Sequence, residues 1–189
     1  MATIILFIII ALAVLVALYI ISTQREFVHL DELCKNAMSQ IAVQLNSRWD
    51  AVTALAKTAA QYAGHESETL INTIRERRQG NITTAEQVNE QQGAISQVLG
   101  RLIAIGEAYP NLKADALYQE AMDGINKYEE NVRMSRMVYN DTATKMNRMV
   151  RQWPSSFVAG LLHFTERAYL DLDEAKKASY PDLDEAFKK

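Results

Sequence analysis

The chain has 189 residues, enough for a membrane anchor and one domain of about 160 residues. Its 20 Lys and Arg against 23 Asp and Glu give a formal net charge of -3 without a basic block, which excludes nucleic acid as an expected partner. Cys34 is the only cysteine, so an intramolecular disulfide and a cysteine-based metal cluster are excluded, and we expect it to be a small core residue.

The chain opens with an uncharged apolar run. No charged residue lies between Ile4 and Ile21, and with the two preceding residues the run has about 20 residues, or roughly 30 Å of helix, enough to cross a hydrocarbon core. A cleavable signal peptide is the alternative, but no basic residue precedes the run and no Ala-x-Ala site follows it. We expect residues 1–23 to be an uncleaved transmembrane anchor. The side chains expected to face lipid are Ile4, Leu6, Phe7, Ile10, Leu15, Leu18 and Ile21.

The charges beside this run predict its orientation. Basic residues are concentrated on the cytoplasmic side of membrane spans, and the nearest ones here, Arg25 and Lys35, follow the run. We therefore expect a single-pass protein whose remaining domain is cytoplasmic. The glycosylation patterns at Asn81 and Asn140 are interpreted as chance matches, because they would matter only on a secretory face.

One long helix is predicted after the anchor. Apolar or small residues recur in steps of three and four from Phe27 to Ile74, which is typical of one helical face. We expect a continuous helix from Gln24 to about Gln79, ended by Gly80. The alternative is a break near Asn46 that would make a compact four-helix monomer. The scarcity of Gly and Pro along the chain favours helices throughout.

Two further long helices are predicted. Overlapping capping boxes that begin at Thr83 and Thr84 start the second, and Pro110 ends it. Asp115 is the expected N-cap of the third, which Pro154 ends.

A short apolar segment and an acidic tail close the chain. Residues 157–164 are expected to form a fourth helix that packs on the bundle, with contact to lipid or another subunit as the alternative. Residues 166–189 are rich in acidic residues and Lys, and we expect an acidic, partly ordered C-terminal tail.

Several stretches of the soluble part resemble the LemA family of bacterial membrane proteins. They are Gln40–Leu45, Tyr62–Leu70, Leu99–Lys113, Tyr139–Asp141 and Trp153–Gly160. The resemblance implies an all-α fold in which one transmembrane helix precedes an antiparallel bundle of long helices, residues 24–165. It also implies a bacterial inner or plasma membrane location and no established enzyme activity.

Two departures from the family pattern lie in the first soluble helix. Ala42 stands where an aspartate is expected, and residues 51–55 lack a proline that commonly kinks this helix. Without that proline a cause of kinking is gone, which favours a straighter helix.

His65 and Glu66 are the most suggestive pair for chemistry, because a histidine beside an acid can transfer protons or bind metal. Adjacent helical residues point about 100° apart, and the HExxH zinc pattern would need a histidine where Thr69 stands. We therefore interpret them as polar bundle contacts and predict no catalytic residues, no metal site and no cofactor.

The predicted helix lengths indicate self-association. At 1.5 Å per residue, the first soluble helix would span roughly 84 Å and the next ones about 39 and 57 Å. The membrane-proximal part of the first helix would then lack an intrachain partner, and neighbouring copies would have to cover its apolar stripe. The stripe consists of Phe27, Leu30, Cys34, Met38 and Ile41.

These patterns predict a non-enzymatic, membrane-anchored protein that self-associates and scaffolds or organises membrane. Its expected partners are the lipid bilayer and further copies of itself. The alternatives are an adaptor that docks another membrane protein, such as a protease, and a metal-dependent enzyme built on His65 and Glu66.

Overall fold

The computed structural model describes residues 1–78 and 82–170, without the side chains of residues 65–68. Its helices are α1 (Ala2–Ala63), α2 (His65–Arg77), α3 (Ala85–Ala108), α4 (Pro110–Lys113), α5 (Ala116–Arg151) and α6 (Ser155–Leu162). No strand occurs among the described residues, and the predicted all-α fold is confirmed.

The helices belong to two compact units. The anchor unit contains Met1–Ala37 and Val138–Tyr169, that is, the first part of α1, the last part of α5 and α6. The second unit contains Met38–Met137 together with Leu170, and so holds the rest of α1 and α5 with α2, α3 and α4. Each unit is therefore built on a segment of the same two long helices.

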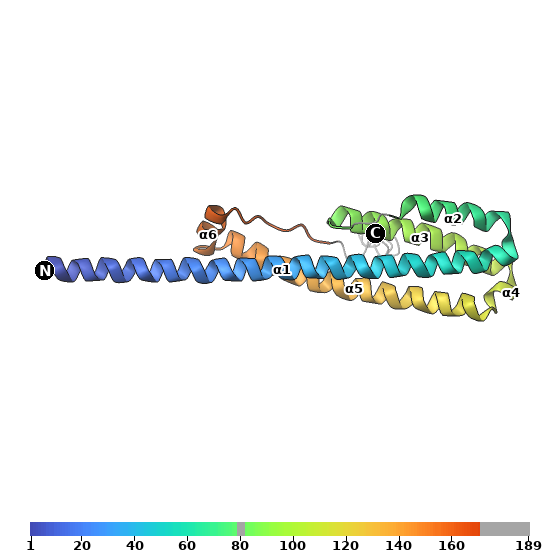
Figure 1. The fold of residues 1–189 in the computed structure, drawn as a ribbon, viewed down its shortest axis with the longest axis horizontal. Helices are drawn as coiled ribbons and strands as arrows, with labels where there is room; N and C mark the ends of the chain where they lie inside the picture. Colours follow the sequence, from blue (N-terminus) through green and yellow to red (C-terminus); the bar gives the residue numbers. More distant parts are fainter. Residues whose placement is uncertain (79–81, 171–189) are drawn as a thin grey trace, which may run out of the picture. The chain divides into compact units, whose positions relative to one another are not determined.

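The N-terminal part of α1 does not pack against other described parts of the anchor unit. Its side chains from Ile4 to Leu18 are exposed, and α1 is the helix among those described that is long and apolar enough to cross a membrane, with a mean hydropathy of 3.4 in its most apolar window. Figure 1 shows this part of α1 extending past α6. All the predicted anchor side chains are exposed here, as a segment surrounded by lipid requires.

The first soluble helix is shorter than predicted. It ends at Ala63, because Gly64 takes a positive φ of 51° that interrupts the helix, and α2 begins at the next residue. The prediction of one helix to Gln79 is thus wrong, and so is the alternative break near Asn46, through which α1 continues. The predicted stop at Gly80 lies outside the described residues.

The other helix boundaries follow the local signals closely. Thr84 accepts a hydrogen bond from the Gln87 amide while the Gln87 side chain accepts one from the Thr84 amide, so the second of the two overlapping capping boxes forms. Asp115 accepts a hydrogen bond from the Leu117 amide at the start of α5. The helix ends at Arg151, three residues before the Pro154 that was predicted to stop it.

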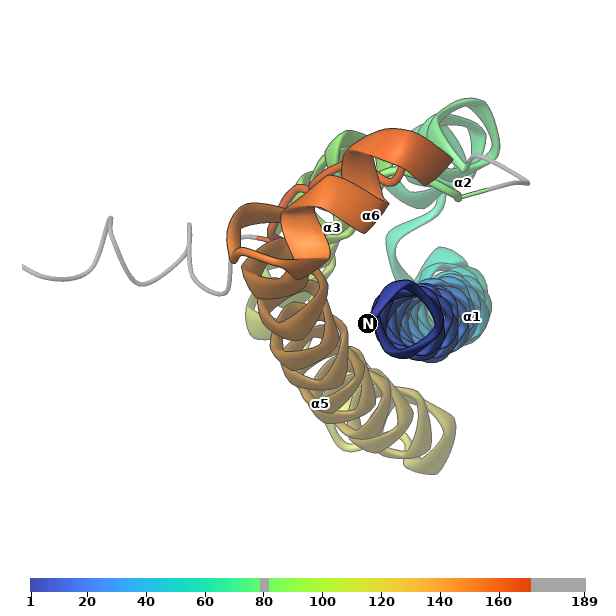
Figure 2. The same cartoon turned by 90° about the vertical axis from the view of Figure 1, so that its left-hand side faces the viewer.

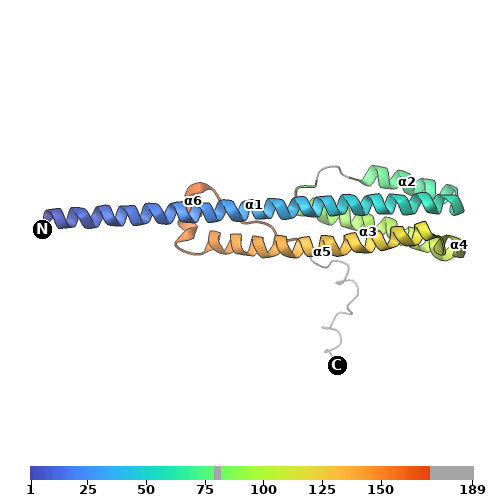
Figure 3. The same cartoon turned by 60° about the horizontal axis from the view of Figure 1, so that its bottom comes forward.

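In the second unit, α5 lies antiparallel to α1 (Figure 3). Gln44 and Arg48 of α1 contact Asn131 and Glu129 of α5, so residue numbers fall on one helix as they rise on the other. α3 lies beside both and runs in the direction of α1, and Leu45, Val52, Leu55, Ile95, Leu102 and Ile125 are fully buried there. The predicted antiparallel arrangement of long helices is confirmed.

The stripe that was predicted to lack an intrachain partner is buried within the chain. Phe27, Leu30 and Cys34 are at most 3% exposed in the anchor unit, and Met38 and Ile41 are buried in the second unit. The helix lengths explain the error: with α1 ending at Ala63, its soluble part spans about 60 Å, and the 36 residues of α5 span about 54 Å. The returning helix is therefore long enough to cover the stripe, and the premise that other copies must do so is wrong.

Candidate functional site

An apolar cluster holds the anchor unit together next to the apolar run of α1. Phe27 and Leu30 of α1 are buried with Met146 of α5 and Ala159 of α6. The ring of Phe27 also stacks on that of Phe164, with centroids 4.8 Å apart and planes 12° from parallel. A stacked aromatic pair contributes about 0.5–1.5 kcal/mol beyond its buried area, so this cluster fixes α6 on α1.

The end of α6 is shaped to bring Phe164 to that cluster. His163 takes the left-handed conformation, with a φ of 58°, which histidine tolerates better than most residues. The Phe164 amide donates back to the Ala159 carbonyl over 3.0 Å. The chain therefore turns sharply after α6 and continues as an extended return segment, residues 164–169.

Side chains of α5 hold the return segment in place. Asn147 donates from Nδ2 to the Arg167 carbonyl over 2.9 Å and accepts from the Arg167 amide at Oδ1 over 2.7 Å. Tyr139 donates from its hydroxyl to the Ala168 carbonyl over 3.2 Å. Asn147 is only 3% exposed, so its side-chain amide is shielded from water and relies on these bonds. Arg167 and Ala168, which lie in the stretch that the sequence assigned to a partly ordered C-terminal tail, are thus attached to α5.

Two ion pairs add to this attachment. Arg167 pairs with Asp31 of α1, which also pairs with Lys35 over 2.7 Å. Burial alone would raise the pKa of Asp31, but its hydrogen bond to Lys35 and the charge of Arg167 outweigh burial and hold that pKa below its ordinary value. On the surface, Arg151 pairs with Glu166 through two hydrogen bonds, which lowers the pKa of Glu166.

A shallow cavity of about 330 Å³ lies between the end of α5 and the return segment. It is lined by Thr144, Asn147, Arg148, Arg151, Gln152 and Tyr169. Hydrogen bonds with Thr144 and Asn147 lower the pKa of Tyr169. The lining residues carry hydroxyl, amide and guanidinium groups and no thiol or imidazole, and most of the lining surface is apolar.

The outward face of α6 is apolar and exposed. Phe157 and Leu161, four residues apart on α6, are 67% and 58% exposed, whereas Val158 and Ala159 on the other face are buried. Trp153, 80% exposed, lies in the turn just before α6. Side chains four apart lie on one side of a helix. The predicted fourth helix therefore packs on the bundle with one face only. The sequence favoured core packing for this segment, with contact to lipid or another subunit as the alternative, and the structure leaves one face of α6 exposed.

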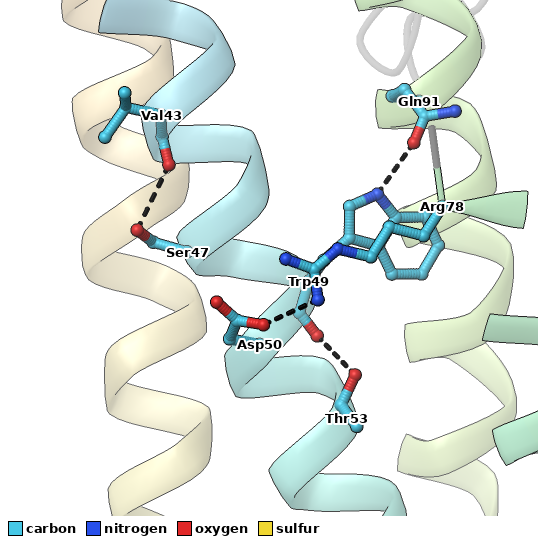
Figure 4. Close-up of polar contacts among 7 residues, drawn as sticks. All are labelled: Val43, Ser47, Trp49, Asp50, Thr53, Arg78 and Gln91. Atoms are coloured by element: carbon cyan, nitrogen blue, oxygen red, sulfur yellow. Dashed lines mark hydrogen bonds and ion pairs between the residues drawn. The ribbon is translucent and has the colours of Figure 1, made fainter. Parts of the chain in front are cut away.

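The interior of the second unit is markedly polar. The Trp49 indole donates to Gln91 Oε1 over 2.8 Å, and Gln91 Nε2 donates to the Arg77 carbonyl at the end of α2. Figure 4 shows the hydrogen bond between Trp49 and Gln91, together with the ion pair of Arg78 with Asp50, whose nitrogen and oxygen atoms are 2.6 Å apart. The bonds of Gln91 join α3 to α1 and to the end of α2, and the ion pair joins the residue after α2 to α1. The fold of this unit therefore depends on polar pairing as well as on apolar burial.

Two buried arginines lie in the same interior. Arg48, 2% exposed, donates to Glu129 over 3.0 Å, while its Nε and Nη1 atoms have no hydrogen-bond partner. Burial lowers the pKa of this guanidinium, and the charge of Glu129 partly opposes that effect. Arg136 of α5 donates to Asn89 and Gln92 of α3. These residues were not singled out from the sequence, because a charge at a core position has no local signature.

The remaining predicted residues are placed as follows. Cys34 is a buried free thiol whose pKa burial raises, which confirms its assignment to the core. The side chains of His65 and Glu66 lie outside the described residues. Within the described part of the chain, no group of three or more His, Cys, Asp or Glu side chains is arranged to hold a metal ion.

Comparison with known proteins identifies the family. The sequence profile of the LemA family matches residues 37–184, a range that extends into the stretch predicted to be a tail. Magnetosome protein MamQ 1 and MamQ 2 of Paramagnetospirillum magneticum are each 27% identical over 90 residues, covering 48% of this chain and 33% of the relative. Magnetosome protein MamQ of Magnetospirillum gryphiswaldense is 29% identical over 77 residues, covering 41% and 28%. The chain thus spans about a third of the length of these curated relatives.

Proposed function

The chain belongs to the LemA family of membrane-associated helical proteins, and we propose that it is a non-enzymatic bundle that self-associates and organises the membrane around its anchor. The observation that carries this proposal is the unbroken course of α1 from Ala2 to Ala63. The same helix supplies the apolar run and a core face of each unit. A continuous hydrogen-bonded helix bends far less than a loop linker, and no loop separates the apolar run from the packed residues of α1 that follow it.

The character of the described residues supports a structural role. Their buried polar groups, such as Gln91 and Arg48, bond to neighbouring helices and not to an open cavity. The one cavity described above lacks a nucleophile with a general base beside it. These side chains rigidify a scaffold and leave its outer surface for contact with other molecules.

Self-association must use a surface other than the stripe from Phe27 to Ile41, because that stripe is buried. Met134 and Met137 of α5 are exposed at 51% and 43% and stand three residues apart on one helical face. Exposed methionines adapt readily to a partner surface. We propose this face of α5 as the place where contact between copies begins.

The test is the particle mass and shape of the full-length protein in mild detergent, by light scattering and electron microscopy. A uniform assembly of several copies supports the proposal. The double variant M134E/M137E should then shift the protein towards monomer. The variant K127E is the matched control, since it changes the net charge by the same amount at an exposed position of the same helix and should leave the mass unchanged.

A monomer of the unaltered protein at all concentrations would overturn self-association. Co-purification from membranes would then be the next measurement, because a stoichiometric second protein is what an adaptor requires. A bundle that assembles alone does not need one.

We further propose that the anchor crosses a bacterial inner or plasma membrane with the bundle on the cytoplasmic side. Arg25 and Lys35, both exposed just after the apolar run, support this orientation. A cysteine introduced at exposed Lys127, in a chain whose own Cys34 is buried, should be labelled by a membrane-impermeant maleimide only after the cells are opened. Labelling in intact cells would show that the bundle lies on the opposite side of the membrane.

A further inference from the structure

We propose that α6 is an interfacial membrane helix. Its exposed Phe157 and Leu161, together with Trp153 of the turn before it, lie in the headgroup region of the bilayer that α1 enters. The proposal depends on membrane insertion of α1 and not on self-association. It gives the protein a second membrane contact, far from its N-terminal anchor in the sequence.

The first argument is the position of α6 along α1, since both belong to the anchor unit. The apolar run ends at Ile21, and Phe27, which contacts the end of α6 through Phe164, follows it by about 9 Å of helix. The polar layer on each side of a bilayer is roughly 5–8 Å thick. A helix about 10 Å wide that lies about 9 Å beyond the end of the apolar run therefore reaches the headgroup layer.

The burial of α1 side chains shows that the packing of the anchor unit begins at the end of the apolar run. Thr23 is only 7% exposed, and Ile20, within the apolar run itself, is partly buried. The preceding residues up to Tyr19 are exposed. The packed part of the anchor unit therefore begins where the apolar run ends, and no aqueous spacer separates the two.

The second argument is the orientation of α6. Figure 2 looks along α1, which is seen end-on, while α6 is seen from the side. Since α1 crosses the membrane, α6 lies across that direction and hence along the membrane plane. Amphipathic helices that bind at the membrane–water interface have this orientation.

The third argument is the chemistry of the exposed face. Trp153 is the most exposed of the three side chains, and tryptophan is enriched where membrane meets water because its ring is apolar and its N–H can still bond. Phe157 and Leu161 give the exposed face of α6 two purely apolar side chains. In water this face would be an exposed apolar patch, whereas at the interface it is covered by lipid.

The structure supports the bilayer as the occupant of this face, because insertion of α1 brings the headgroup layer next to α6. A second copy or another protein would have to bind at the membrane surface and displace lipid from the same face. The proposed contact also explains why three large apolar side chains stay outside the apolar cluster of Phe27 and Leu30, which is already closed by Ala159 and Phe164.

Tryptophan fluorescence of the full-length protein in phosphatidylcholine nanodiscs tests the proposal. The chain has two tryptophans, and Trp49 is fully buried in the second unit, so quenching by lipid brominated near the headgroup end of its acyl chains should report on Trp153. We expect the Trp153 component to fall about twofold or more in brominated nanodiscs. In the variant W153F the quenching should disappear.

A matched pair of charge substitutions sharpens the test. L161E should reduce the quenching of Trp153, because a carboxylate resists entry into the interface. L117E, at a leucine of the second unit with the same 58% exposure, should not. Circular dichroism of both variants verifies that they are folded.

Three outcomes would overturn the proposal. Trp153 could be unquenched by brominated lipid and fully accessible to acrylamide, which would place α6 in water. It could be shielded from both quenchers, which would assign the face to a protein partner. Equal quenching of W153F would show that Trp153 is not the residue in contact with lipid.

Discussion

The anchor unit and the second unit use segments of the same two long helices, α1 and α5, yet they bury different chemistry between them. In the anchor unit the contact is apolar, with Phe27, Leu30, Met146 and Phe164 packed together. In the second unit, the interior includes Arg48, Gln91 and Arg136 next to aliphatic side chains. The second unit therefore adds polar pairs to apolar burial, whereas the contact of α1 with α5 in the anchor unit is apolar.

This difference matches what each unit must specify. Polar pairs in a core disfavour alternative registers, because a slip leaves buried groups without partners. The second unit has several helices of similar apolar character to align. The anchor unit instead fixes one short helix and one return segment. The stacked rings of Phe27 and Phe164 hold the helix, and the two hydrogen bonds of Asn147 with Arg167, here called the Asn147 clamp, hold the return segment. The following predictions are given from the largest expected effect to the smallest.

Removing the central ring should affect the anchor unit most. Phe27→Ala deletes a fully buried side chain and the stack with Phe164, and we expect a loss of about 3–5 kcal/mol in the free energy of unfolding of this unit. Hydrogen exchange in detergent should show faster exchange in residues 164–169 and little change in the second unit. Phe157→Ala, at an exposed phenylalanine of α6, serves as the control and should change stability by less than about 0.5 kcal/mol in detergent.

The return segment should depend on one amide side chain. Asn147→Ala leaves the Arg167 amide and carbonyl without partners in a buried place, at a cost of about 2–3 kcal/mol. The Arg167 amide should lose its protection from exchange. The exposed Asn126→Ala on the same helix should be close to neutral. Equal effects of the two variants would mean that the clamp contributes nothing.

The polar interior of the second unit should respond asymmetrically to substitution. Glu129→Ala leaves the buried Arg48 charge unpaired, and we expect a loss of about 1–3 kcal/mol, below the figure for a fully buried pair because Glu129 is half exposed. Arg48→Met removes the charge and fills the space, so stability should change by less than about 1 kcal/mol or increase. Denaturant unfolding of both variants measures this. A larger loss for Arg48→Met than for Glu129→Ala would refute the argument.

The smallest effect should be a pH dependence confined to the anchor unit. The pKa of Asp31 is lowered in the folded chain, so its contribution to stability is present above the unfolded pKa of about 4 and is lost as the pH falls through the lower folded value. Asp31→Asn should therefore be less stable than the unaltered protein near neutral pH. The two stability curves should converge in acid, and parallel curves across this range would exclude the contribution.

Local signals in the sequence predicted local structure well. The Thr84–Gln87 capping box, Asp115 at the start of α5 and Pro154 after its end act within a few residues of where they stand, so each operates in any context. The apolar stripe was likewise recognised as a buried face. What the periodicity could not supply was the identity of the surface that buries it.

The errors arose where a local signal was weak or a distant contact decided. Gly64 interrupts α1, although a single glycine in an otherwise helical pattern is often tolerated. Once that boundary was misplaced, the helix lengths no longer matched and the stripe from Phe27 to Ile41 was assigned to other copies. The clamp of Asn147 on Arg167 joins residues 20 apart, and no local pattern marks it.

The sequence by itself determined the apolar run, the helical class, the family and most helix boundaries, because these depend on hydropathy, periodicity and capping over short distances. Only the tertiary structure decided that the stripe is buried within the chain and that Arg48 and Gln91 lie inside a core. It also decided that Trp153 and the Phe157 and Leu161 face of α6 stay exposed in the unit that contains the apolar run. These features depend on which helix faces meet after the chain reverses, and that is set by helix lengths and side-chain packing summed over the whole fold.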